Sequence, residues 1–179
     1  PGTPDISPLL DAGRAALEQN DASAAMLAYQ EALSALPESV EAMAGFVRTL
    51  VLSGETEQAR EILNSLEEAT LGRPEMREAI ATVEIAEQAG TQFGEIETLR
   101  AAVDSEPDNM QARQDLALAL FSNGDTRDAM DVLLEALRFN PDWNEGAAKT
   151  QLFAFFEALG APHPDVIKAR RKLSTYLFS

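Results

Sequence analysis

The chain has 179 residues and a formal net charge of −16, and it contains no cysteine. So acidic a chain lacks the basic face that nucleic acid requires and is repelled by an anionic membrane surface, so neither is an expected partner. The absence of cysteine excludes disulfides and thiol chemistry in these residues, and frequent Ala with only 6% aromatic residues favours closely packed helices over a β sandwich.

The predicted elements are helices throughout, each about 12–15 residues long, and no strand is expected. One series of residues lies between the two helices of each pair. Gly or Asn just after a helix adopts the left-handed conformation that lets the chain reverse. These residues, at spacings of 34, 36, 34 and 36, are Asn20, Gly54, Gly90, Gly124 and Gly160. A second series of breakers falls between them, at Pro37, Pro74, Pro107 and Pro141. In chain order, the expected helices cover residues 7–19, 22–35, 39–52, 56–69, 75–89, 94–105, 109–122, 126–139, 144–159 and 164–178.

Two stretches that begin 104 residues apart share one pattern. DASAAMLAYQEALSALP occupies residues 21–37, and DTRDAMDVLLEALRFNP occupies residues 125–141. Both begin with Asp and end with Pro, and their separation is three periods of the turn series. The matched stretches are therefore the same helix in the first and the fourth copy of one repeat.

The period and its residue types resemble the tetratricopeptide repeat. That motif places small residues at its eighth, twentieth and twenty-seventh positions and proline at its thirty-second. Counted from residue 6, the chain has Gly13, Ala25, Ala32 and Pro37 there, and counted from residue 110 it has Ala117, Ala129, Ala136 and Pro141. Small side chains let antiparallel helices approach closely, while large neighbours fill the holes beside them. The resemblance implies an all-α fold, a right-handed α–α superhelix of tetratricopeptide-like hairpins with about ten helices.

The expected organisation has three parts. Residues 1–6 are expected to be a linker remnant, residues 7–142 to form four tetratricopeptide-like repeats, and residues 143–179 to form a C-terminal capping helix pair. Two of the repeats are degenerate, since Leu66 and Glu95 stand where small residues belong. The superhelix is therefore expected to be irregular in its middle.

Residues that could support catalysis are scarce. The single histidine, His163, lies between two prolines and is expected in a surface loop. One histidine without cysteine does not make a zinc site. Neighbouring carboxylates such as Glu67 and Glu68 are interpreted as a solvated helix face. We therefore expect no enzyme activity, no cofactor and no metal.

Tetratricopeptide arrays usually bind peptides in a concave groove, and one subclass holds a C-terminal carboxylate there through Lys and Asn. The corresponding positions here are Leu10 and Arg14 in the first repeat, and Gln114 and Leu118 in the fourth. That clamp is absent. A basic or apolar partner therefore suits the groove better than an acidic tail.

The last predicted helix combines an apolar stripe with a basic cluster. The stripe consists of Val166, Ala169, Leu173, Tyr176 and Leu177. One interpretation is a capping helix that covers the end of the array, with its bases toward the favourable C-terminal pole. The other is that the helix also docks a partner protein, through the candidate residues Lys168, Arg170, Arg171, Lys172, Leu177 and Phe178.

Several stretches in the C-terminal half resemble a more specific family, the bacterial thioredoxin-like co-chaperones of the YbbN type. The most telling are LALAL, AMDVLLEALR, FFEALG and ARRKL. Members of that family carry an N-terminal thioredoxin fold followed by a helical array. They are described as redox-linked holdases that cooperate with the chaperonin and protect unfolding clients under stress. The resemblance implies a cytoplasmic module whose partners are unfolded clients and the chaperonin.

The chain itself has no Trp-Cys-x-x-Cys motif, so it would correspond to the client- or chaperonin-binding half of such a protein. A scaffold subunit of an envelope or secretion assembly is the alternative, because helical arrays are common there too. The open ends of a solenoid can also pair with a second copy, so a dimer stays open.

Overall fold

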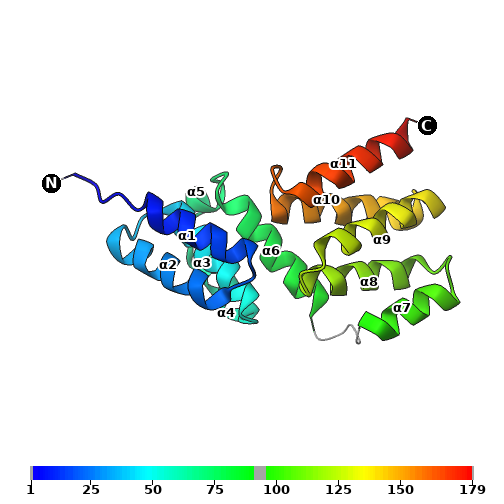
Figure 1. The fold of residues 1–179 in the computed structure, drawn as a ribbon, viewed down its shortest axis with the longest axis horizontal. Helices are drawn as coiled ribbons and strands as arrows, with labels where there is room; N and C mark the ends of the chain where they lie inside the picture. The colour runs from blue at the N-terminus through cyan, green and yellow to red at the C-terminus, as the bar shows by residue number, and fades with distance from the viewer. Residues whose placement is uncertain (1, 91–95, 179) are drawn as a thin grey trace. The chain divides into compact units, whose positions relative to one another are not determined.

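The computed structural model describes residues 2–90 and 96–178, and every regular element in those ranges is a helix (Figure 1). The expected all-α helical repeat is confirmed. The α-helices are α1 (Ser7–Glu18), α2 (Ala22–Ala35), α3 (Val40–Leu52), α4 (Thr56–Ser65), α5 (Glu68–Leu71), α6 (Met76–Ala89), α7 (Ile96–Ser105), α8 (Met110–Ser122), α9 (Thr126–Phe139), α10 (Ala147–Leu159) and α11 (Pro164–Leu177). A 3-10 helix, η1 (Trp143–Gly146), precedes α10. The chain divides into two compact units, Pro1–Glu84 and Ile85–Ser179, with the division inside α6.

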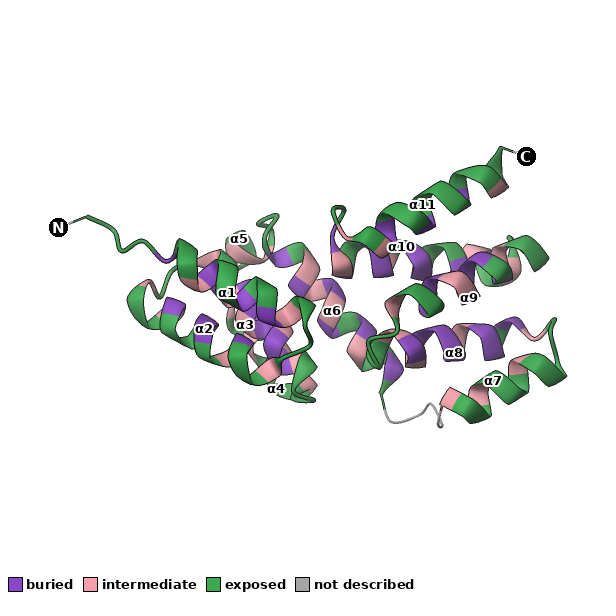
Figure 2. Ribbon diagram, viewed as in Figure 1, coloured by how far each residue is buried: buried purple, intermediate pink, exposed green. Residues whose placement is uncertain are grey.

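The first unit is a stack of helix hairpins. Helix α2 packs on α1 and α3, and α3 packs in turn on α1 and α4. Small residues lie in its interior: Ala25, Ala32 and Ala59 are fully buried. In Figure 2 the buried residues lie along the sides of the helices that face their neighbours, while the outer sides are exposed. The core of this unit therefore follows the small-residue spacing seen in the sequence.

The second unit repeats the same arrangement. Helix α8 packs on α7 and α9, and α9 also contacts α10 and α11. Ala117, Ala129 and Ala136 are buried where the repeat pattern places small residues. The stacked rings of Phe121 and Phe155, with centroids 4.1 Å apart, join α8 to α10. The two stretches that match in sequence are thus the same element, α2 and α9, in the two units.

The turns between helices have the predicted left-handed residues. Positive φ angles occur at Asn20, Gly54, Gly90, Gly124 and Gly160. In three of these turns, the next residue donates its backbone N–H to the carbonyl five residues earlier, at 2.8–2.9 Å: Asp21 to Ala16, Glu55 to Leu50 and Asp125 to Leu120. This bond closes the end of each first helix and starts the second helix on its return path.

Two predicted helices differ from the structure. The helix expected at 56–69 ends at Ser65, because Leu66 is extended (φ −83°, ψ 148°) and packs its side chain against the core, and the short α5 follows. The helix expected at 144–159 begins only at Ala147, because Asn144 and Glu145 have positive φ angles that an α-helix cannot continue. The helix start expected at residue 94 and the degenerate site at Glu95 lie outside the described residues.

Candidate functional site

Two side chains stabilise the N-terminus of the last helix, α11. His163 is its N-cap, and the imidazole Nδ1 accepts a hydrogen bond from the Asp165 backbone N–H at 3.2 Å. The Asp165 carboxylate accepts a hydrogen bond from the Thr126 hydroxyl at 2.8 Å, which ties the start of α11 to the start of α9. His163 therefore lies in the loop before α11, as expected, and also caps that helix.

The apolar stripe predicted for α11 is buried along most of its length. Val166, Ala169 and Leu173 are buried, Tyr176 is half-buried, and Leu177 is exposed. The guanidinium of Arg138 on α9 lies 5.3 Å from the centre of the Tyr176 ring. Helix α11 therefore covers α9, while its last turn leaves apolar surface uncovered.

The four predicted basic residues of α11 point in two directions. Lys168, Arg171 and Lys172 line a cleft toward α9, and the Lys172 ammonium contacts the Asp131 carboxylate at 2.6 Å. Arg170 lies instead over the ring of Phe156 on α10, 5.4 Å from its centre. Three of the six candidate residues therefore lie together in the cleft, whereas the fourth base, Arg170, contacts the neighbouring helix α10.

The two remaining candidates, Leu177 and Phe178, end the helix. Their exposed fractions are 57% and 87%, so more than half of Leu177 and most of Phe178 lie in solvent. Neither lines the basic cleft. They form a separate apolar tip at the free end of α11.

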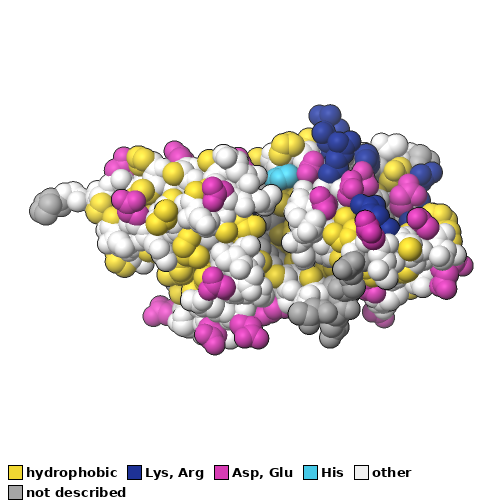
Figure 3. Space-filling view, turned by 60° about the horizontal axis from the view of Figure 1, so that its bottom comes forward, with side chains coloured by type: hydrophobic (Ala, Val, Ile, Leu, Met, Phe, Trp, Pro, Cys, Tyr) yellow, Lys and Arg dark blue, Asp and Glu magenta, His cyan; other side chains and the backbone are white. Residues whose placement is uncertain are grey.

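The α9–α11 cleft has a volume of about 240 Å³ and is lined by Arg127, Met130, Asp131, Asp165, Lys168, Ala169, Arg171 and Lys172. The two apolar residues are buried and form its floor. In Figure 3, Lys and Arg side chains gather over one part of the C-terminal unit, with Asp and Glu side chains beside them. Four cations thus face two carboxylates around one small apolar hollow.

Sequence reasoning missed Arg127, because that residue lies on α9 and not in the basic cluster of α11. No pattern within one helix links Arg127 to the α11 cluster, but the structure relates the two helices by one offset. The Lys172–Asp131 pair joins residues 41 apart, and the same offset places Arg127 level with Lys168. Stacked helices of a repeat protein bring residues at one such offset into register.

Other kinds of site find no support in residues 2–90 and 96–178. No group of three His, Asp or Glu side chains in those ranges is arranged to hold a metal ion. Within the same ranges, none of the helices has the length and apolar character needed to cross a bilayer.

Comparison with known proteins decides the family. Residues 16–83 and residues 89–178 each match a family model described as tetratricopeptide repeat. The chain is a tetratricopeptide repeat protein. One similar solved structure is a domain of protein VP0806, of unknown function, from Vibrio parahaemolyticus RIMD 2210633. It is 22% identical, with 93% of this chain and 96% of that chain covered and a TM-score of 0.44. None of the curated proteins matches the chain.

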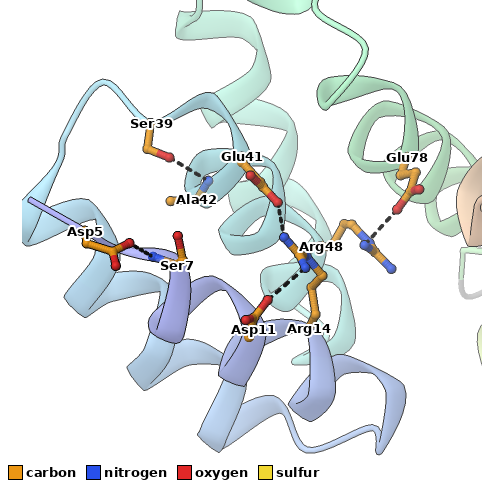
Figure 4. A network of polar contacts seen from close by, with 9 residues as sticks. All are labelled: Asp5, Ser7, Asp11, Arg14, Ser39, Glu41, Ala42, Arg48 and Glu78. Carbon is orange, nitrogen blue, oxygen red and sulfur yellow. Dashed lines mark hydrogen bonds and ion pairs between the residues drawn. The ribbon is translucent and has the colours of Figure 1, made fainter.

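The tetratricopeptide repeats of the first unit carry an ion-pair ladder across their first helices (Figure 4). Arg14 on α1 pairs with Asp11 at 3.0 Å and with Glu41 on α3, and Arg48 on α3 pairs with Glu78 on α6 at 2.9 Å. The hydrogen bond to the Glu41 carboxylate raises the pKa of Arg14. Arg14 occupies the repeat position that would line a peptide groove, and it already holds carboxylates of its own chain.

Proposed function

We propose that this tetratricopeptide repeat chain is the client- or chaperonin-binding half of a cytoplasmic thioredoxin-like co-chaperone that holds unfolding proteins during stress. The coarser role is established by the family, since tetratricopeptide repeats are protein-interaction modules. The finer role is supported by the sequence resemblance to the YbbN type. Its candidate binding surface consists of Lys168, Arg170, Arg171, Lys172, Leu177 and Phe178.

One observation carries the proposal: exposed apolar side chains are concentrated toward the C-terminus. Seven large apolar side chains are exposed in the described part of the chain, and five of them belong to residues 139–178. Three lie on α11 or at its C-cap: Ile167, Leu177 and Phe178. Unfolded polypeptides expose apolar segments, and an uncovered apolar tip beside basic residues offers them a matching surface.

The test is suppression of aggregation. A reporter enzyme is unfolded by heat with and without the purified chain, and light scattering follows its aggregation. We expect the wild-type chain to lower the scattering and the double variant Leu177→Ser/Phe178→Ser to lose most of this effect. Both residues are exposed, so their replacement leaves the core intact.

The matched control is Leu27→Ser on α2, which removes an apolar side chain that is 70% exposed from the other unit. It is expected to keep full protection. A wild-type chain that leaves scattering unchanged, or a control that loses protection as fully as the double variant, contradicts the holdase role. Co-elution of envelope components from a lysate, with no chaperonin, would favour the scaffold alternative.

A further inference from the structure

We infer that the α9–α11 cleft binds the carboxylates of a short acidic segment of a partner protein. This inference rests on the proposed role as a protein-interaction module and names the chemistry of one partner. The cleft lies between the second helices of two successive hairpins. It is thus a different site from the first-helix face, where Arg14 and Arg48 are occupied by Glu41 and Glu78.

Three of the four cations in the cleft have no carboxylate partner within the described residues. Lys172 is paired with Asp131 at 2.6 Å. Arg127, Lys168 and Arg171 make no ion pair in residues 2–90 and 96–178, and all three belong to the cleft lining. Cations from two helices that converge on one hollow present several donors to the same acidic group.

The two carboxylates of the cleft are already engaged. Asp131 accepts from Lys172, and Asp165 accepts from the Thr126 hydroxyl at 2.8 Å. They hold α11 against α9 and leave the cleft with an excess of two positive charges. Because the whole chain carries −16, this excess is a local reversal of sign. An approaching acidic group is therefore attracted here and repelled by most of the remaining surface.

The size of the cleft and the total charge together limit the ligand. A hollow of about 240 Å³ accommodates a few side-chain groups and no more. A long polyanion such as RNA would extend beyond it, over a chain whose net charge repels it. The buried Met130 and Ala169 on the floor suit the methylene groups of Glu side chains. These features favour a short peptide segment with adjacent glutamates.

The test measures binding of fluorescein-labelled hexaglutamate to the whole chain by fluorescence polarisation at low salt. We expect binding that weakens as salt is added. The variant Lys168→Glu/Arg171→Glu should weaken binding by about tenfold or more, because it removes two charge-assisted contacts. The same variant should bind labelled hexalysine more tightly than the wild type does, since the local charge changes sign.

The matched control is Arg73→Glu/Arg77→Glu, which makes the same change in net charge at two exposed residues of the first unit. It should keep hexaglutamate affinity within about twofold, because neither arginine lines the cleft. Circular dichroism melting of both variants confirms that each is folded. Absence of binding by the wild type, or equal loss in both variants, overturns the inference. Tighter binding of an RNA oligomer of equal charge also overturns it.

Failure of this inference and failure of the proposed function give different results. If the chain suppresses aggregation through Leu177 and Phe178 but does not bind hexaglutamate, the acidic-segment site is wrong and the holdase role stands. If hexaglutamate binds in the cleft and aggregation is unaffected, the site stands and the holdase role is wrong.

Discussion

The ring of Tyr29 on α2 fills the space between two glycines on neighbouring helices. Its side chain is 2% exposed, and it lies against Gly13 on α1 and Gly45 on α3. A Cβ atom added at Gly13 would lie 2.5 Å from the Tyr29 ring, and one added at Gly45 would lie closer still. Glycine normally weakens a helix interior, so its presence at these positions reflects the space that the ring needs.

Gly45→Ala is expected to destabilise the protein, although Ala is the better helix former. The added methyl group forces the buried ring to move, and overpacking of this kind costs about 1–3 kcal/mol in the free energy of unfolding. Urea denaturation measures the loss. In a Tyr29→Ala background the same substitution should cost less, because the obstructing ring is gone.

Gly72→Ala is the control for that substitution. Gly72 has a negative φ of −73°, and an added Cβ would meet its nearest atom at an ordinary 3.5 Å. The control variant should be neutral or slightly more stable than the wild type. Equal stability of Gly45→Ala and Gly72→Ala would show that the ring does not constrain its neighbours.

Tyr29 also predicts a dependence of stability on alkaline pH. Burial raises the pKa of its phenol above the usual value of about 10. The charges of Arg48 and Arg14 act against this shift, whereas Glu41 and Glu78 add to it. The folded state therefore holds the phenol proton up to a higher pH than the unfolded state does. The resulting contribution to the free energy of unfolding is fully present below pH of about 10 and is lost as pH rises toward the folded pKa.

Tyr29→Phe removes that contribution and provides the measurement. Below pH of about 9, the difference in unfolding free energy between wild type and variant should stay constant. Above pH of about 10, the wild type should lose stability faster than the variant. Titration of tyrosinate absorbance should also lose the component that ionises above the usual pH of about 10 in the variant. Parallel stability profiles up to strongly alkaline pH would contradict a perturbed Tyr29.

At the scale of elements, the two matched helices offer a controlled comparison of N-caps. Asp21 caps α2, where its carboxylate accepts the Ala24 backbone N–H at 3.0 Å. Asp125 has the equivalent place before α9 but makes no cap hydrogen bond with its side chain. Asp21→Ala should therefore cost about 1 kcal/mol of stability, and Asp125→Ala should cost less than about 0.5 kcal/mol. Urea midpoints of the two variants test this order. A larger loss of stability for Asp125→Ala than for Asp21→Ala would contradict the prediction.

Most helices and turns could be predicted from the sequence because the same helix and turn pattern recurs in each repeat. The turn residues Asn20, Gly54 and Gly124 were all found with positive φ, since one local geometry recurs at each. The end of α4 was not predictable from periodicity, because Leu66 continues the apolar pattern while its backbone is extended to reach the core. The late start of α10 depends on positive φ at Asn144, which no pattern of apolar residues signals.

The candidate site was only partly visible in the sequence for a related reason. A run of bases on one helix is a local pattern, so Lys168, Arg171 and Lys172 were identified together. Whether each base faces α9 or α10 depends on the packing angle of α11, and this separated Arg170 from the others. Arg127 comes from another helix, and pairing across helices is a tertiary property.

For the whole molecule, the first unit contains a complete core of its own. Its two buried clusters use residues between Ile6 and Val83, and the second cluster includes Met76, Ala79 and Val83 from the first turns of α6. The division between the units falls at residues 84 and 85, within α6. A cut at that point would interrupt a helix, whereas a cut after Gly90 keeps α6 whole.

A fragment of residues 1–90 is therefore expected to fold alone. It keeps both core clusters, and its length exceeds the roughly 40 residues below which a domain needs disulfides or metals. Circular dichroism should show a helical spectrum and a cooperative urea transition. A fragment of residues 1–75 is the control: it lacks the three α6 side chains that close the second cluster, so Ala44, Leu50 and Leu63 lose packing partners and cooperativity should fall. If the 1–90 fragment is unfolded in water, the first unit depends on contacts outside its own core, and the independence inferred from the clusters is wrong.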